Sequence, residues 1–480
     1  MGKYKNLLVN IGLFGLNTIA TKLITFLLVP LYTYYMSSAE FGITDMSVTV
    51  INLIMPLATL SIADATLRYA LEDEGYAKKY ITAGTLVVSL SCVIVLCCLP
   101  LLNMQMFGGL GDYRWLFLLS YIANAYQMYL NNVARAVNEV KIIPVASGVT
   151  AVVTGALAYV FIGFMHMTID GYFWSLIIGN LIGCVFYLTG GHLMKYFTAI
   201  TTKDFKDCMR PMLKYSLPLI PNALFWWVGT SINRFFITSM LGISLSGLFA
   251  AASKIPSLLN IICGVFQQAW TLSAFQEFRR TNISNFFTKI FRVFQCGMVA
   301  SSSAIILVAP WLAKLLLQKE FYSSWVLVPT MIIAFYFNTM NAFYGTVYTA
   351  SMRTKTLFTT TVAGAIVIVV GTYLLLPVFK LQGACVAMIV SNLVVLILRM
   401  IYSTRYIEVK VHWVTVLPSV FLLCVQAAVM ALEMTHYIFW SFIIFCAIIL
   451  IQMIDLIPVC KEILKRRKGH MQEATEKETK

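Results

Sequence analysis

Hydrophobic residues occupy most of the chain in long runs that follow one another almost without pause. The hydrocarbon core of a membrane is about 30 Å thick and needs roughly 20 apolar residues per spanning helix. The sequence therefore predicts an all-α integral membrane protein with about fourteen transmembrane helices. We expect these helices at residues 10–33, 42–63, 80–102, 114–135, 144–165, 170–190, 214–240, 244–270, 290–317, 323–348, 357–377, 381–402, 413–432 and 437–459.

The composition agrees with this interpretation and excludes a soluble domain. Of 480 residues, 60% are hydrophobic and only 11% are charged, whereas soluble domains are near half apolar and a quarter charged. The first apolar run is not followed by a small-residue cleavage site, so we expect it to be a retained helix. The eleven cysteines show no metal-ligand spacing, and we expect neither a metal nor another cofactor.

The net charge of +15 would suggest nucleic acid in a soluble chain. Here the positively charged residues follow the rule that cytoplasmic loops are rich in Lys and Arg, so no nucleic-acid partner is expected. If the N-terminus is cytoplasmic, almost all loop cations fall on the cytoplasmic side through all the predicted spans. The pattern places both termini in the cytoplasm. The predicted inner loops carry Lys78, Lys79, Arg135, Lys141, Lys195, Lys203, Lys206, Arg210, Lys214, Arg279, Arg280, Lys289, Arg292, Arg353, Lys355, Arg405 and Lys410.

A weak internal repeat divides the predicted helices. A shift of 205 residues places Asn17 on Asn222 and Gly42 on Gly247. Parallel repeats of this kind form two lobes with a substrate cleft between them in many transporters. We therefore predict two six-helix lobes around a central cavity, two extra helices and a charged cytoplasmic tail, at residues 1–200, 201–410, 411–460 and 461–480.

Polar residues recur at three- and four-residue steps on several of the predicted helices, so they share one helix face. Such residues can join helices in closed contacts or line a hydrated cavity, and their concentration in matching helices of the two lobes favours the cavity. The candidate lining residues are Asn17, Thr18, Thr25, Asn52, Asn222, Ser257 and Asn260.

Lys22 lies within the first apolar run, about twelve residues or roughly 18 Å from the cytoplasmic end of its helix. A charge at the centre of the membrane costs about 2.5–3.5 kcal/mol on insertion scales, so Lys22 needs water, an anion or a carboxylate. A structural pair with Asp45 is one alternative. Lys254 is similarly deep, and Arg234 could reach the outer interface by extending its side chain.

These three cations outnumber the deep carboxylate Asp45 in the predicted helices. A cavity with this balance favours an anionic ligand such as a phosphate or pyrophosphate. Asp64 and Arg68 stand four residues apart, which is also the spacing of a plain helical ion pair. A role of Asp45, Asp64 or Arg68 in gating, or in coupling to protons or sodium ions, stays open.

Three stretches resemble the polysaccharide-type flippases of the multidrug/oligosaccharidyl-lipid/polysaccharide exporter superfamily. "FLLVPLYTYYMSSAEFG" is similar to the end of that family's first helix and the turn that follows it. "LSIADATLRYAL" and "FQQAWTLSAFQEF" resemble the inner ends of its second and eighth helices. The number of spans and the two-lobed organisation extend the resemblance over nearly the whole chain.

The resemblance implies a flippase in the bacterial inner membrane. Its substrate would be an undecaprenyl-pyrophosphate-linked oligosaccharide, moved from the cytoplasmic to the outer leaflet by alternating access, for O-antigen or other surface polysaccharide. In relatives, basic residues of the first helix and the C-terminal lobe line the cavity; Lys22, Arg234 and Lys254 occupy comparable places. Its other implied partners are membrane lipids, and an association with glycan polymerase machinery stays open.

Two rival functions fit the sequence less well. An ion-coupled multidrug exporter of the same superfamily usually carries cations and would need a cavity rich in acidic residues. A membrane glycan polymerase would need a sizeable external loop, but the longest predicted one spans roughly residues 103–113. No nucleotide-binding or zinc-protease motif occurs in the chain, so we expect a transporter and not an enzyme.

Overall fold

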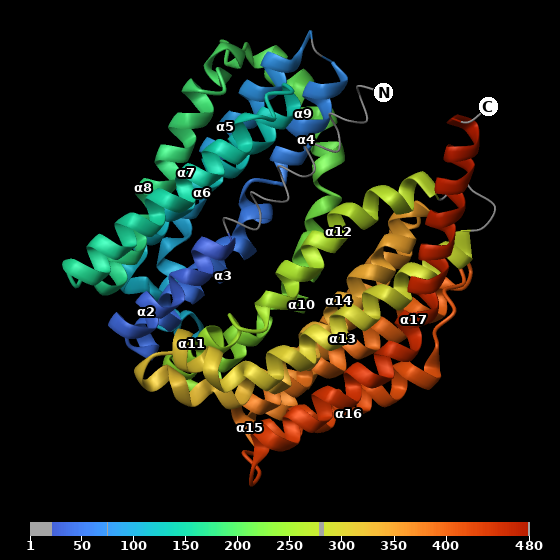
Figure 1. Cartoon of the computed structure of the whole chain (residues 1–480). Helices are drawn as coiled ribbons and strands as arrows, with labels where there is room; N and C mark the ends of the chain where they lie inside the picture. The colour runs from blue at the N-terminus through green and yellow to red at the C-terminus, as the bar shows by residue number, and fades with distance from the viewer. Residues whose placement is uncertain (1–21, 74, 278–282, 479–480) are drawn as a thin grey trace. The chain divides into compact units, whose positions relative to one another are not determined.

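The computed structural model describes residues 22–73, 75–277 and 283–478. These residues form helices joined by turns, with no strand among them (Figure 1). Their contacts divide the chain into two units. The first unit contains Met1–Lys254, Lys314–Ser324 and Ala365–Ala384, and the second contains Ile255–Ala313, Trp325–Gly364 and Cys385–Lys480.

The first described segment of the first unit is a helical stretch over residues 22–27. Its α-helices are α2 Val29–Tyr35, α3 Ser38–Ala58, α4 Ile62–Glu72, α5 Ala77–Cys98, α6 Arg114–Ala136, α7 Ile142–Ala158, α8 Thr168–Thr189, α9 Thr202–Ser216, α10 Leu219–Leu241 and α11 Ile243–Ala252. Short helical turns connect them: η1 Leu99–Asn103, η2 Gln105–Phe107, η3 Leu110–Tyr113, η4 Tyr159–Phe164 and η5 Leu193–Tyr196.

The second unit contains α12 Ser257–Glu277, α14 Val328–Ala350, α16 Trp413–Ala431 and α17 Tyr437–Glu478. Helices α13 Ile283–Leu316 and α15 Thr354–Ser403, and the turn η6 Lys319–Leu327, contribute to both units. Aromatic rings fill the core of the second unit, where Trp270 stacks on Phe343 with 5.0 Å between ring centroids. Helix α14 is the most deeply buried of the candidate membrane spans.

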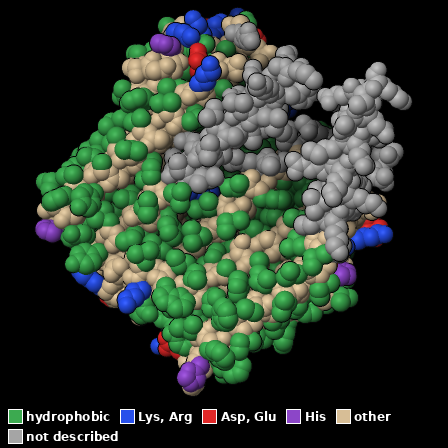
Figure 2. Space-filling model, in the orientation of Figure 1, with side chains coloured by type: hydrophobic (Ala, Val, Ile, Leu, Met, Phe, Trp, Pro, Cys, Tyr) green, Lys and Arg blue, Asp and Glu red, His purple; other side chains and the backbone are tan. Residues whose placement is uncertain are grey.

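The all-α membrane fold predicted from the sequence is confirmed. Among the described residues, nine helices are long and apolar enough to cross a membrane, or ten if α11 and α12 form one bent span. The face drawn in Figure 2 is covered mostly by hydrophobic side chains, as expected of a surface in contact with lipid. The count of fourteen spans is consistent with these helices, although half of the first predicted span, residues 10–21, lies outside the described residues.

Several predicted boundaries differ from the structure because backbone breaks are hard to see in sequence. The second predicted span breaks at Leu60 and Ser61, whose φ angles are 53° and 49°. The eighth is bent by 46° between α11 and α12. The seventh was predicted to begin at residue 214, but α10 begins at Leu219, after the separate helix α9.

Within the first unit, α3 and α11 touch through two glycines. A Cβ atom added to Gly247 would lie 1.9 Å from the Ser38 carbonyl oxygen, and one added to Gly42 would lie 2.4 Å from the Ile243 carbonyl oxygen. The 205-residue shift superimposes these same two glycines. Contact between equivalent residues is the relationship expected at a two-fold axis. The division into two six-helix lobes itself stays a prediction.

Candidate functional site

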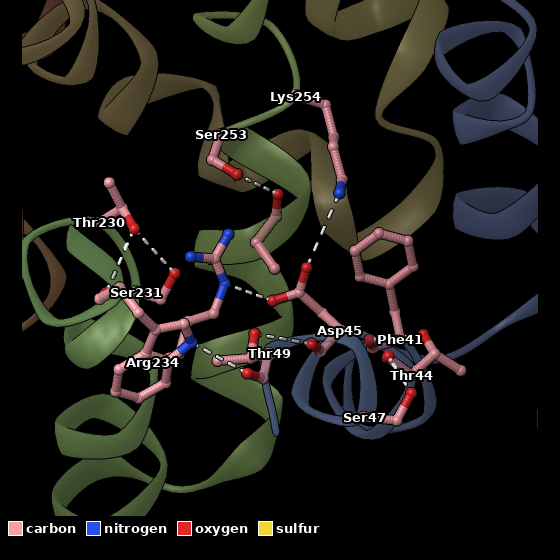
Figure 3. Close-up of polar contacts among 12 residues, drawn as sticks. Phe41, Thr44, Asp45, Ser47, Thr49, Thr230, Ser231, Arg234, Ser253 and Lys254 are labelled. Atoms are coloured by element: carbon pink, nitrogen blue, oxygen red, sulfur yellow. Dashed lines mark hydrogen bonds and ion pairs between the residues drawn. The ribbon is translucent and has the colours of Figure 1, made fainter. Parts of the chain in front are cut away.

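Three charged side chains meet inside the first unit: Asp45 on α3, Arg234 on α10 and Lys254, just after α11 (Figure 3). Arg234 Nε donates a hydrogen bond to Asp45 Oδ2. Lys254 Nζ lies 3.7 Å from the other carboxylate oxygen, Oδ1. One carboxylate therefore faces two cations, and the charge of the three side chains sums to +1.

The packing of α3 against α10 fixes the geometry of this cluster. Trp227 on α10 donates from its Nε1 atom to the Thr49 carbonyl oxygen on α3 over 3.0 Å. Thr49 lies one helical turn after Asp45, and Arg234 lies about two turns after Trp227. The Trp227 hydrogen bond and the ion pair therefore lie on the same faces of the two helices. The Gly42 contact holds α11 close to the same face of α3, about one turn before Asp45.

The two cations are held to different degrees. The side chains of Asp45 and Arg234 are 11% and 18% exposed, whereas that of Lys254 is 32% exposed. A buried pair with direct hydrogen bonding is costly to break, because it leaves an uncompensated charge. The Lys254 contact with Asp45 is longer, and Lys254 is the most exposed of the three side chains.

The structure corrects one alternative for Lys22. Asp45 pairs with Arg234 and Lys254, not with Lys22. Lys22 is exposed on the helical stretch over residues 22–27 and forms no ion pair with any residue that the structure describes. The alternative that Arg234 simply reaches the interface is also wrong, because its guanidinium is engaged by Asp45.

The helical pair considered for Asp64 and Arg68 is wrong as well. Arg68 Nε instead lies 3.1 Å from Glu72 Oε1, and its guanidinium stacks over the Tyr215 ring at 4.6 Å. Arg68 stands four residues from both Asp64 and Glu72, and the sequence alone does not show which of the two carboxylates it pairs with. Asp64 is exposed on the wall of a cavity in the first unit, together with Arg135.

The predicted polar lining residues are distributed over both units. Asn52 on α3 and Asn222 on α10 are exposed. Thr25 lines the same cavity as Asp64. Ser257 and Asn260 are half-buried on α12 in the second unit. Asn17 and Thr18 lie outside the described residues. A role of these residues in lining a substrate path stays a prediction.

Sequence reasoning missed a second arginine within a membrane helix, Arg399 on α15. Its guanidinium donates to the Asn341 carbonyl oxygen over 2.7 Å and to the hydroxyls of Thr360 and Thr361 over 3.2 Å each. No carboxylate of the described residues pairs with it. A lone arginine in the apolar stretch "LVVLILRM" was the signal that could have identified it.

The helices and the charged cluster define a polytopic helical membrane protein with a buried cationic site. The chain belongs to the polysaccharide biosynthesis protein family, whose sequence profile matches residues 7–275, more than half of the chain. No curated protein matches the chain in sequence.

Solved structures with low sequence identity share the fold over most of the chain. The lipid II flippase MurJ, in an inward closed conformation, superimposes with a TM-score of 0.70 at 12% identity, covering 94% of this chain and 99% of MurJ. An inward-facing multidrug resistance MATE transporter of the MOP superfamily gives 0.64 at 14% identity, covering 81% and 94%. A MOP superfamily transporter from Pyrococcus furiosus, whose binding pocket has reverse polarity, gives a TM-score of 0.60 at 14% identity, covering 82% of this chain and 95% of that transporter. The chain thus has the fold of MOP-superfamily transporters.

Proposed function

We propose that the chain is a flippase for undecaprenyl-pyrophosphate-linked oligosaccharides, working from the cytoplasmic to the outer leaflet of the bacterial inner membrane. It acts by alternating access, as a transporter without enzymatic activity or a bound cofactor. The product serves O-antigen or other surface polysaccharide synthesis. Both termini lie in the cytoplasm.

The charge of the Asp45 cluster is the observation that carries this proposal. Two cations share one carboxylate between helices of the membrane domain, so the three side chains together carry a net positive charge. A pyrophosphate headgroup has the opposite charge. Arg can bind it in a bidentate manner, and Lys can bind it as a point charge.

The exposed cation Lys22 supports the same ligand class. An uncovered ammonium at this depth is expensive in hydrocarbon and needs water or an anion. The family to which the chain belongs is named for polysaccharide biosynthesis, and MurJ is named as a lipid II flippase. An anionic lipid-linked glycan is a substrate that would suit both of these described functions and would also suit the cationic site.

The proposal is tested by deleting the gene in its native host and identifying the lipid-linked material that accumulates. Loss of the flippase should leave an undecaprenyl-pyrophosphate-linked oligosaccharide on the cytoplasmic leaflet and deplete the surface glycan. Normal surface glycan together with new sensitivity to cationic drugs would instead identify a multidrug exporter.

A further inference from the structure

A polar cavity of about 650 Å³ lies inside the first unit, separate in its residues from the Asp45 cluster. Its walls come from α4, α6, α7, α8 and the chain around Ile24. The volume falls within the 300–1,000 Å³ typical of small-molecule sites. Five carboxamide side chains line it: Asn124, Gln127, Asn131 and Asn132 from α6, and Asn180 from α8.

Two of these carboxamides bond across the cavity wall. Gln127 Nε2 donates to Thr150 Oγ1 over 2.7 Å, and Asn131 Nδ2 donates to the Tyr187 hydroxyl over 2.8 Å. These contacts orient the amides and leave their carbonyl oxygens available. Hydrogen bonds between its own side chains therefore hold this part of the cavity wall in place.

The other three carboxamides, Asn124, Asn132 and Asn180, form no side-chain hydrogen bond with any residue that the structure describes. Asn132 and Asn180 are nevertheless only 7% and 8% exposed, so the surface they retain faces the cavity. Polar groups at membrane depth need a protein partner, water or a ligand. Three unmet carboxamides around one cavity indicate that its occupant makes hydrogen bonds.

The chemistry of the wall favours a neutral polyhydroxylated occupant. A carboxamide both donates and accepts, which matches a sugar hydroxyl. Apolar side chains of Leu28, Met128 and Leu176 also line the cavity and suit the C–H faces of a sugar ring. Among the described residues that line the cavity, Asp64 and Arg135 are the charged ones, and their opposite signs give no net preference for an anion or a cation.

We propose that this carboxamide cavity binds sugar residues of the glycan, whereas the Asp45 cluster binds the pyrophosphate. This inference rests on the proposed function and adds a second subsite to it. The nature of the sugar repeat is then read by helices α6 and α8, through hydrogen bonds that a bare polyprenyl pyrophosphate cannot make.

Two ligands and two variants separate the subsites in binding measurements on the full chain in lipid nanodiscs. The ligands are the host's own lipid-linked oligosaccharide, extracted from the deletion strain, and undecaprenyl pyrophosphate without sugar. The double variant Asn124→Ala/Asn180→Ala should lower the affinity for the sugar-bearing ligand about tenfold to a hundredfold, the loss expected for two hydrogen bonds. Its affinity for the sugar-free ligand should stay within about twofold of the wild-type value. Arg234→Gln should lower the affinity for both ligands. Asn103→Ala, outside both subsites, is the control.

The outcomes distinguish failure of this inference from failure of the proposed function. If the double asparagine variant binds both ligands like the wild type, or loses both equally, the cavity is not a sugar subsite. If Arg234→Gln leaves both affinities unchanged, the cationic site is not the pyrophosphate site and the proposed function loses its support.

A cross-linking measurement keeps the test decisive if the double variant fails to fold. A photoreactive phenylalanine in place of Met128, on the cavity wall, should label the sugar-bearing ligand. The same group at Met165, which does not line the cavity, should not. Equal labelling from both positions, or none from position 128, would overturn the proposal.

Discussion

Gly42 on α3 and Gly247 on α11 bring the backbones of two helices into direct contact. Their sequence positions differ by the 205-residue shift that relates the two halves of the predicted repeat. Small residues allow such close approach between membrane helices. The contact also determines where Asp45, three residues after Gly42, and Lys254, seven residues after Gly247, can meet.

Gly247→Ala should destabilise the protein, because its Cβ atom would lie 1.9 Å from the Ser38 carbonyl oxygen. Overpacking of this kind costs about 1–3 kcal/mol. Thermal melting of the purified protein in detergent measures the effect. Gly229→Ala on α10 is the matched control, since no atom other than the backbone of its own helix and its chain neighbours lies within 4 Å of the added Cβ. Equal melting temperatures for the two variants would contradict the close contact.

Arg399→Lys should also lower the melting temperature, although it keeps the charge. An ammonium cannot reach the three acceptors that the planar guanidinium bonds at once, and each lost bond is worth about 0.5–1.5 kcal/mol. Arg405→Lys, on an exposed turn, provides the comparison and should change stability little. If Arg399→Lys melts like the wild type, the three hydrogen bonds do not hold α15 in place.

The ion pair between α5 and α9 should make stability depend on pH. Lys79 Nζ lies 2.8 Å from Asp204 Oδ1, and this hydrogen bond lowers the pKa of Asp204. A carboxyl group with a lowered pKa in the folded state stabilises the protein above its unfolded pKa, near 3.9. That stabilisation is lost as the pH falls through the lowered value.

The wild type should therefore melt at a higher temperature than Asp204→Asn at pH 7, and the difference should disappear at low pH. Melting curves in detergent across the acidic range check this. Asp207→Asn, on the same helix, should show no such difference, because Asp207 forms no ion pair with a described residue. A pH-independent gap between the wild type and Asp204→Asn would show that the pair contributes in some other way.

The proposed orientation of the chain predicts the behaviour of reporter fusions. A reporter that is active only outside the cytoplasm should be active after Gly111 and inactive after Lys203. The reason is the excess of Lys and Arg in the loops assigned to the cytoplasm. The reverse pattern would overturn the assignment of every loop.

Much of the helical fold could be predicted because membrane helices have a strong length and hydrophobicity signal. The break between residues 377 and 381 is one example, since the structure interrupts α15 at Lys380, where φ is 48°. The bend between α11 and α12 and the positive φ angles at Leu60 and Ser61 were not predicted. They depend on tertiary packing and not on composition.

The candidate site could be predicted only in part. Charge within an apolar segment identified Lys22, Asp45, Arg234 and Lys254 individually. The partner of Asp45 could not be predicted, because Arg234 lies 189 residues away and helical spacing carries no information over that distance. The carboxamides of α6 and α8 each resemble ordinary helix contacts, and only the structure brings them around one cavity.

Export by a charge-neutral triple variant, Asp45→Asn/Arg234→Gln/Lys254→Gln, tests the central claim most directly. The variant removes the carboxylate together with both cations that pair with it, so it should fold and enter the membrane at a normal level. We predict that it fails to restore surface glycan in the deletion strain, because no cation of the cluster remains to hold the pyrophosphate. Restoration to the wild-type level would show that these charges only join helices, and would contradict the account.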